Sequence, residues 1–570
     1  MSERITGAEA LMRSLQAAGV KTIFGYPGGA IMPVFDALYD YTRGATKAFD
    51  HILVRHEQAA AHAAEGYARV SGKVGVCLVT SGPGATNTIT GVADAMMDST
   101  PIVVIAGQVS TAALGTDAFQ EVDLVGMSQP ITKWSYQIRS AADVAWAVSK
   151  AFYIARSGRP GPVVLDFPKN AQQGLTEWQP VDHVSLRSYH PYPTISVEAV
   201  AQAAELINHA KRPLALVGQG VELAGAQAEL SAFLERADIP AARTLLGLSA
   251  LSTFHPLNMG MVGMHGNYAP NMKTQECDVL IAVGMRFSDR VTGNLATYAR
   301  QAKVIHLDID VTEIDKNVKT DVAVLGDCRQ TLAAITDRLE PAKHTEWIRS
   351  FGKYADMERQ KVIEPAIHPT TGPLLMGEVI NEVAEQTQAN AILVNDVGQN
   401  QMMSCRYFKY RHSRSVVTSG GLGTMGFGLP AAVGAVLGAP QRQVCLFMGD
   451  GGFQMSIQEL GTIMEQRLPL KMILLNNNYL GNVRQWQDMF FHGRKSYTRM
   501  LNPHYQSVCQ GYGIGYGVAV GRGELRARVA EMLSAEGPYL LECAVKEEDN
   551  VLPMITPGSS VDEMILEVNL

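Results

Sequence analysis

The chain has 570 residues and a formal net charge of -7 at pH 7, with 46% hydrophobic and 18% charged residues. This composition is typical of a globular protein with several domains, and it excludes a disordered chain or a basic nucleic-acid-binding protein. No apolar run approaches the roughly 18 residues that a membrane span needs, so no membrane association is expected. The seven cysteines form no CxxC pair, which favours free thiols in a reducing compartment. A cytoplasmic protein is expected, with a processed organellar form as the alternative.

The first predicted element is a helix in "MSERITGAEALMRSL", where Thr6 and Glu9 form a capping-box pattern. Short β-branched runs then alternate with helix-length segments along the chain, which predicts parallel sheets with helices on both faces. Residues 170–193 and about 340–372 interrupt this pattern and resemble linkers. We therefore predict an α/β fold of three doubly wound parallel-sheet domains, at residues 1–180, 190–345 and 365–570. The first and third domains each contain a "VCL" strand before a glycine-rich turn, which suggests related architectures.

In the first domain, Glu57 starts the predicted helix of "RHEQAAAHAAEGYARVSG". At helical spacing its face continues through Ala61, Ala64 and Ala68, which are small and apolar. One interpretation is an ordinary first-turn glutamate that the helix dipole favours. The other is a buried catalytic acid in an apolar pocket that raises its pKa. The choice depends on what the rest of the chain supplies for such an acid to act on.

The stretch "MGDGGFQMSIQELGTIMEQRLPLKMILLNNN", residues 448–478, carries the strongest chemical signal. A strand ends at Asp450, a helix follows, and a second strand ends just before Asn477. In a right-handed βαβ unit, both side chains leave the sheet at its carboxyl edge, where ligands bind. Carboxylate and amide oxygens suit Mg²⁺, and the helix N-terminus favours a phosphate. This combination is far more specific than a single GDG turn.

The arrangement resembles the diphosphate-binding signature of thiamine-diphosphate enzymes, and Glu57 then matches the family's catalytic glutamate. The resemblance implies that Glu57 contacts the aminopyrimidine ring of the cofactor and exchanges a proton with it. It also implies that the Gly423 carbonyl accepts from the 4′-amino group, while Met425 separates the two rings. Further positions follow from the resemblance: Gln399 and Gly451 would contact the cofactor, and Asp450, Asn477 and Tyr479 would hold Mg²⁺.

The resemblance extends over essentially the whole chain and is close to the acetohydroxyacid (acetolactate) synthase catalytic subunits. The segments that carry it include "FGYPGGAIMPVFDALY", "TSGPGATNTITGVADA", "GTDAFQEVDLVGMS", "SGRPGPVVLDFPK", "GLGTMGFGLPAA" and "RQWQDMFF". The implied fold has a pyrimidine-binding domain, a central FAD domain and a diphosphate-binding domain. The implied reaction decarboxylates pyruvate and condenses the hydroxyethyl group with a second pyruvate or 2-oxobutyrate. The products would be 2-acetolactate or 2-aceto-2-hydroxybutyrate, for valine, leucine and isoleucine biosynthesis.

By the same resemblance, Gln108, Gly29 and Lys169 belong to the reaction centre. Arg290 would bind a substrate carboxylate, and Trp486, expected in a loop, would set the preference for the acceptor. For Arg290 and Lys169, an ordinary surface or structural ion pair is the simpler interpretation. Trp486 could equally be a residue of the hydrophobic core.

The central domain resembles the family's FAD domain, although "GQGVELAG" is no GxGxxG fingerprint. The implied flavin contacts are Arg159, His265, Arg286, Asp308 and Asp327. Because the reaction is redox-neutral, FAD would be structural. The chain departs from the family at four positions that bear on cofactor affinity and acceptor preference: Ser288, Asn400, Gly452 and Asn482.

The expected assembly is a homodimer or a dimer of dimers, because this family builds each site from the first domain of one subunit and the third domain of another. A small regulatory subunit is a possible partner. Two alternatives stay open: another thiamine-diphosphate enzyme such as pyruvate oxidase, which uses FAD for redox chemistry, and a non-catalytic cofactor-binding module.

Overall fold

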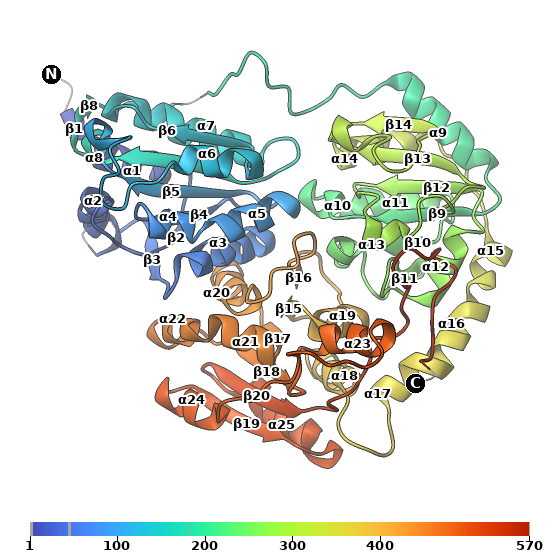
Figure 1. Ribbon diagram of the computed structural model, residues 1–570. Helices are drawn as coiled ribbons and strands as arrows, with labels where there is room; N and C mark the ends of the chain where they lie inside the picture. The colour runs from blue at the N-terminus through green and yellow to red at the C-terminus, as the bar shows by residue number, and fades with distance from the viewer. Residues whose placement is uncertain (1–3, 44–46, 182, 569–570) are drawn as a thin grey trace.

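The computed structural model describes residues 4–43, 47–181 and 183–568, and it shows three α/β units, each around a six-stranded sheet (Figure 1). All strand pairs within these three sheets are parallel. The first sheet has the order β3-β2-β4-β5-β7-β6. Its strands are β2 (Thr22–Gly25), β3 (Asp50–Leu53), β4 (Gly75–Val79), β5 (Ile102–Gln108), β6 (Trp134–Gln137) and β7 (Val163–Pro168).

The third sheet repeats the topology of the first. Its order is β16-β15-β17-β18-β20-β19, so in both sheets the second strand flanks the first and the sixth precedes the fifth. The expectation of related architectures is therefore confirmed. Its strands are β15 (Ile392–Asn395), β16 (Val416–Val417), β17 (Val444–Gly449), β18 (Lys471–Asn476), β19 (Gly515–Ala519) and β20 (Tyr539–Ala544).

The middle sheet has a different order, β11-β10-β9-β12-β13-β14. The direction in which strands are added reverses between β9 and β12, and such a switch point opens a ligand crevice at the carboxyl ends of the strands. The strands are β9 (Pro213–Val217), β10 (Ala241–Arg243), β11 (Asn258–Met261), β12 (Val279–Val283), β13 (Lys303–Asp308) and β14 (Val322–Leu325).

Each sheet is buried on both faces, as a doubly wound fold requires. Along β5, Val103 and Ile105 belong to one apolar core, while Val104 and Ala106 belong to another. The second of these cores continues into the third unit, where it includes Leu446 of β17. The first and third units therefore share one core.

Helices α3 (Glu57–Ser71) and α20 (Gly428–Gly438) form the seam between these two units. A Cβ atom at Gly66 would lie 2.0 Å from the Ala431 carbonyl oxygen, and one at Gly434 would lie 1.8 Å from that of Ala63. Only glycine fits at such distances, so the two helices pack backbone against backbone.

Two predicted features near the chain start and the domain junctions need correction. Glu9 does not complete a capping box on α1 (Gly7–Ala17): Thr6 accepts the Glu9 N–H at 3.1 Å, but the Glu9 carboxylate accepts from Arg13 and Tyr41. The predicted second linker is largely helical, with α15 (Thr345–Ser350), α16 (Gly352–Glu358) and α17 (Glu364–Ile367). Its mixed charge hid an apolar face on which Trp347 and Phe351 are buried.

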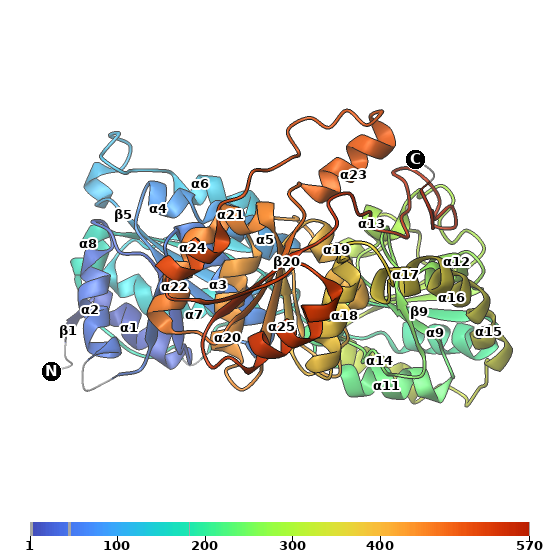
Figure 2. The ribbon, with the colours of Figure 1, turned by 90° about the horizontal axis from the view of Figure 1, so that it is seen from below.

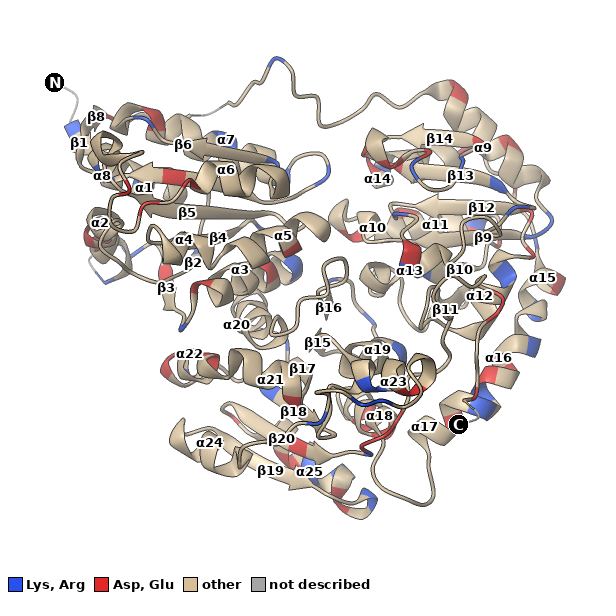
Figure 3. Ribbon diagram, viewed as in Figure 1, with Lys and Arg blue, Asp and Glu red and all other residues tan. Residues whose placement is uncertain are grey.

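The first predicted linker, residues 170–193, begins in α8 (Lys169–Gln173) and continues into a strand: β8 (Leu175–Glu177) pairs antiparallel with β1 (Arg4–Thr6). Figure 3 shows basic and acidic residues interspersed along the described elements rather than gathered in one basic stripe. Among the described residues, no helix is long and apolar enough to cross a membrane. The predicted domain boundaries themselves stay predictions.

Candidate functional site

The four residues predicted at the reaction centre lie at the carboxyl edge of the first sheet. Gly29 follows β2, Glu57 follows β3, Gln108 ends β5, and Lys169 follows β7 as the first residue of α8 (Lys169–Gln173). Gln108 is opposite Pro168 in the ladder, which places it beside Lys169. Parallel strands bring these loops to one edge of the sheet.

Glu57 is half-buried at the start of α3, and its Oε2 accepts from Nδ2 of Asn87 at 2.9 Å. The alanines that follow it have a further role in close packing, and their part in its pocket stays a prediction. A Cβ at Gly91 would lie 2.4 Å from Cβ of Ala61, and one at Gly75 would lie 2.2 Å from the Ala64 carbonyl oxygen. These alanines let a helix and a strand of the first unit approach α3 closely.

Gln108 is 1% exposed, and hydrogen bonds to other residues of the first unit fix its side-chain amide. Its Nε2 donates to the Val122 carbonyl at 2.8 Å and lies 3.4 Å from Oδ2 of Asp166. Gln137 donates to the same Asp166 oxygen at 2.7 Å. Burial raises the pKa of Asp166 to about 6. Sequence reasoning missed Asp166, although a lone acid inside the apolar strand "VVLDFP" was an available signal.

Asp450 and Asn477 follow neighbouring strands of the third sheet, because β17 pairs directly with β18. Asp450 starts α21 (Asp450–Ser456) and is 1% exposed; burial raises the pKa of its carboxyl. It accepts from the Gly451 N–H at 3.1 Å and from Nδ2 of Asn502 at 2.8 Å. Within the described chain, no lysine or arginine pairs with this buried carboxylate. A hard cation fits such an acceptor set.

Asn502 is a further residue that sequence reasoning missed. Its Nδ2 also donates to Oδ1 of Asn476 at 2.9 Å and to Oδ1 of Asn478 at 3.1 Å. One amide therefore fixes the turn after β18 against Asp450. Asn502 lies 52 positions beyond Asp450 in an irregular segment, where no motif indicated it.

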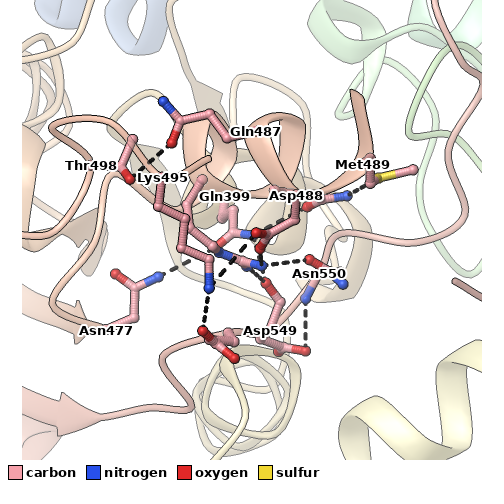
Figure 4. A network of polar contacts seen from close by, with 12 residues as sticks. Gln399, Asn477, Gln487, Asp488, Met489, Lys495, Thr498, Asp549 and Asn550 are labelled. Atoms are coloured by element: carbon pink, nitrogen blue, oxygen red, sulfur yellow. Dashed lines mark hydrogen bonds and ion pairs between the residues drawn. The ribbon is translucent and has the colours of Figure 1, made fainter. Parts of the chain in front are cut away.

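The predicted cofactor residue Gln399 begins α19 (Gln399–Tyr407) and contacts the same edge (Figure 4). Its Oε1 accepts from Nδ2 of Asn477 at 3.3 Å, and its Nε2 donates to the Asp549 carbonyl at 2.8 Å. Asn477 in turn accepts the N–H of Tyr479 at 3.2 Å through Oδ1. The predicted metal residues Asn477 and Tyr479 are thus joined to Gln399.

Trp486 lies in helix α23 (Gly481–Phe490) rather than in the expected loop. The helix forms because the C-terminal segment holds it: the buried Arg484 donates to the Asp549 carbonyl and, at 3.0 Å, to Oδ1 of Asn550. Gln485 and Val551 exchange two hydrogen bonds. Figures 1 and 2 both show α23 beside the C-terminal segment.

The glycine-rich loop before α20 brings Met425 to the Asp450 turn. A Cβ at Gly451 would lie 3.6 Å from Cε of Met425, so these two predicted cofactor residues are neighbours. Gly423, at φ +73°, stands at the exposed tip of the loop. The buried Asp396, which sequence reasoning missed, accepts the N–H groups of Gly426 and Gly428 at 3.1 and 2.8 Å.

A cavity of about 630 Å³ lies at the switch point of the middle sheet. It brings together eight predicted residues: Arg159, His265, Arg286, Arg290, Asp308, Asp327, Gly423 and Trp486. The volume and the mixture of arginines and carboxylates fit a dinucleotide, whose diphosphate and hydroxyl groups such side chains bind. Burial lowers the pKa of His265 to about 4, so its imidazole is neutral at pH 7.

Two arginines that line this cavity differ in their surroundings. The side chain of Arg290 is 62% exposed and contacts Asp289 at 3.2 Å, which leaves it available at the cavity mouth. Arg159 is already paired with Glu313 and Asp310, at 2.7 and 3.1 Å. Glu57 is absent from the residues that line this cavity, and none of its hydrogen bonds within the described chain reaches the third sheet.

Three domain families match the chain: the N-terminal thiamine pyrophosphate-binding domain at residues 5–127, the central domain at 200–335, and the C-terminal thiamine pyrophosphate-binding domain at 396–543. The chain is 44% identical over 564 residues to the acetolactate synthase isozyme 2 large subunit of Escherichia coli K12, covering 98% of this chain and 99% of the relative. The chain belongs to the acetolactate synthase large-subunit family. The Lactococcus lactis large subunit is 42% identical (98% and 96% covered), and that of Parasynechococcus marenigrum is 45% identical (99% and 91%).

The four departures from the family pattern all lie near the proposed site. Asn482 lines the middle cavity, and its buried Oδ1 has no hydrogen-bond partner among the described residues. The buried Oδ1 of Asn400 likewise has no hydrogen-bond partner among the described residues. Ser288 lines the cavity beside the exposed Asp289, and Gly452 is packed against the Asp396 carboxylate. These four residues line or adjoin the proposed site, and none of them replaces Glu57 or Asp450.

Proposed function

We propose that this protein is an acetolactate synthase. It decarboxylates pyruvate and condenses the two-carbon unit with a second pyruvate or with 2-oxobutyrate, for branched-chain amino-acid biosynthesis. The observation that carries the proposal is the convergence of Asp450, Asn477, Met425 and Gln399 at one sheet edge, in a chain that is similar to acetolactate synthase large subunits over nearly its whole length.

At the third sheet, Asp450, Asn477 and the backbone of Tyr479 would hold Mg²⁺, which would supply positive charge for the diphosphate of the cofactor. Gln399 and Gly451 complete this side, while Gly423 and Met425 contact the rings. Thiamine diphosphate, when bound, supplies an electron sink for decarboxylation and carbon–carbon bond formation. The buried carboxylate of Asp450, which forms no ion pair with a lysine or arginine among the described residues, is the feature that supports the metal.

At the first sheet, Glu57 holds and transfers a proton at its carboxylate, while Asn87 fixes the carboxylate's orientation through Oε2. Gln108, Gly29 and Lys169 lie at the same edge and face the reacting keto acids. Arg290, exposed at the cavity mouth, binds the carboxylate of the acceptor, and Trp486 forms the wall that sets acceptor size.

The middle cavity would hold FAD as a structural cofactor. Arg159, His265, Arg286, Asp308 and Asp327 are the residues that contact it. The supporting observation is the cavity at the switch point of a 3-2-1-4-5-6 sheet, the topology that binds dinucleotides. The condensation transfers no net electrons, so the flavin has no stoichiometric redox role.

The working assembly is a homodimer or a dimer of dimers in which Glu57 of one subunit faces Asp450 of the other. Glu57 bonds only within the first unit in the described chain, which supports completion of the site by a second copy. A small regulatory subunit is a further proposed partner, since several relatives are named as large subunits.

The test is formation of acetolactate from pyruvate with Mg²⁺ and thiamine diphosphate, without an electron acceptor. Acetolactate should accumulate, and 2-oxobutyrate should divert part of the product to 2-aceto-2-hydroxybutyrate. Acetate formation that requires an electron acceptor and bleaches the flavin would instead assign the alternative, a pyruvate oxidase. If neither acetolactate nor acetate forms, the result would indicate a non-catalytic module.

A further inference from the structure

One carboxylate of the first unit forms hydrogen bonds with a loop of the third unit. Asp98, which follows α5 (Ile89–Met97), is completely buried. Its Oδ1 accepts the N–H of Gly421 at 2.7 Å, and its Oδ2 accepts the N–H of Gly420 at 2.8 Å. Nη2 of Arg69 also donates to Oδ2, at 2.6 Å. Two successive N–H groups and one guanidinium therefore share a single carboxylate.

A second acid of α5 holds the base of the same loop. Asp94 accepts the hydroxyl hydrogen of Ser419 at 2.7 Å, and the Ser419 oxygen accepts the N–H of Thr424 at 2.8 Å. The loop of residues 419–424 is thereby closed on itself and attached to α5. Its tip, residues 421–423, is exposed and lines the middle cavity.

The tip contains two glycines, so its conformation depends on backbone contacts rather than on packed side chains. Gly423 lies two residues beyond the N–H that Asp98 holds. The two sequence neighbours of Asp98 lie at the middle cavity, which is proposed to hold FAD. Ser99 accepts from Nε of Arg159 at 2.9 Å, and Met97 lines the cavity. Asp98 is thus situated between the residues proposed to contact FAD and those proposed to contact thiamine diphosphate.

We propose that Asp98, oriented by Arg69, is a positioning residue that fixes the loop of residues 419–424 so that Gly423 can receive thiamine diphosphate. The inference rests on the proposed role of Gly423. It adds that cofactor affinity depends on a first-unit carboxylate of the same chain that contacts the loop and no substrate.

The chemistry of the two acids separates this role from simple packing. An asparagine at position 98 keeps one acceptor oxygen and turns an NH₂ group toward a backbone N–H, while Arg69 loses its counter-charge. An asparagine at position 94 still accepts the single hydroxyl hydrogen of Ser419. Both positions are fully buried on adjacent turns, so Asp94→Asn is a matched control for Asp98→Asn.

The experiment measures thiamine diphosphate affinity in Mg²⁺ by isothermal titration, with KM for the cofactor, kcat and melting temperature, on the full chain. Asp98→Asn should weaken binding and raise KM by about 10- to 100-fold, as loss of an outer-shell partner does, with a smaller change in kcat. Asp94→Asn should bind within about threefold of the wild type. Equal affinity in the wild type and Asp98→Asn, or equal losses in both variants, overturns the proposal.

A second variant covers failure of Asp98→Asn to fold. In Gly421→Ala, the new Cβ would lie 2.7 Å from Oδ1 of Asp98, which displaces an exposed loop without removing a buried charge. The same loss of affinity is expected, and unchanged affinity refutes the positioning role. Wild-type protein that binds thiamine diphosphate but forms no acetolactate defeats the proposed function instead, while the comparison of affinities still decides the role of Asp98.

Discussion

Asn477 donates its side-chain N–H to Oε1 of Gln399 at 3.3 Å, which joins the turn after β18 to the first residue of α19. The nitrogen of this amide is therefore occupied, and its Oδ1, which accepts the Tyr479 N–H, keeps a second lone pair that can meet a cation. Gln399 passes the constraint on to the Asp549 carbonyl, to which Arg484 of α23 also donates. The proposed metal edge and the helix that carries Trp486 are consequently held by one hydrogen-bonded network (Figure 4).

The first prediction concerns the metal edge. Asp450→Ala should abolish Mg²⁺-dependent binding of thiamine diphosphate, because the metal joins the protein to the diphosphate. Asn502→Ala should weaken it by about 10- to 100-fold, since Asn502 only orients Asp450 and the turn after β18. Titrations with and without EDTA measure both effects. Chelation should weaken binding to the wild type but leave Asp450→Ala unchanged; a variant that still responds to Mg²⁺ contradicts the assignment.

Glu57→Gln should retain cofactor affinity but slow exchange of the cofactor's C2 proton by about 10²- to 10⁴-fold, the usual contribution of a general acid or base. The amide keeps the shape of the side chain and can still accept from Asn87. Deuterium exchange followed by NMR measures the rate. Asn87→Ala is the companion variant and should cause a smaller loss. An unchanged exchange rate in Glu57→Gln would remove Glu57 from the chemistry.

The seam between the first and third units gives a stability prediction. Gly434→Ala places a methyl group 1.8 Å from the Ala63 carbonyl oxygen, so α3 and α20 must separate and the melting temperature should fall sharply. Gly523→Ala, within α25 (Arg522–Ser534), meets nothing within 4 Å. It should stabilise the protein by about 0.4–1 kcal/mol, because alanine leaves the unfolded chain less conformational freedom than glycine does. Similar melting temperatures for the two variants would show that the seam is not tightly packed.

Asp166 gives a pH prediction. Burial raises the pKa of this acid from 3.8 to about 6, so the folded protein holds its proton more tightly than the unfolded chain. Stability should therefore fall as pH rises from about 4 to about 6, by an amount on the order of 3 kcal/mol for a shift of about two units. Asp166→Asn should lack this loss. Urea unfolding at pH 4 and pH 7.5 tests it: the variant's advantage should appear at pH 7.5 and shrink at pH 4, and an equal advantage at both would contradict it.

The sequence was most informative where function depends on local motifs. The alternation of strands and helices predicted the three parallel sheets, and the spacing from Asp450 to Asn477 predicted that both follow adjacent strands. The sequence placed Glu57 at the start of a helix but did not predict how far its side chain is buried. Burial depends on helices that pack against it from elsewhere in the chain.

Contacts between distant segments could not be predicted. Asp98 meets Gly420 and Gly421 across 322 and 323 positions, and a lone aspartate in "MMDST" has no pattern that indicates this. Trp486 was expected in a loop directly after the metal motif. The helix α23 is stabilised instead by Asp549 and Asn550, near the end of the chain.

The last prediction concerns the assembly. Glu57 belongs to the first unit and Asp450 to the third, and in the described chain Glu57 makes its hydrogen bond to Asn87 of its own unit. If each site combines the first unit of one subunit with the third unit of its partner, both Glu57→Ala and Asp450→Ala homodimers should be inactive. A mixed dimer would contain one site with both substitutions and one site with neither, so mixing the variants should restore activity.

Random exchange of subunits makes half of the dimers mixed, and each mixed dimer has one intact site out of two. A 1:1 mixture should therefore regain about one quarter of the wild-type activity per subunit under this two-fold symmetric arrangement. Differently tagged subunits, isolated by two successive affinity steps, confirm that mixed dimers form. If purified mixed dimers are inactive, each cofactor is held within a single chain, and the proposed shared site is wrong.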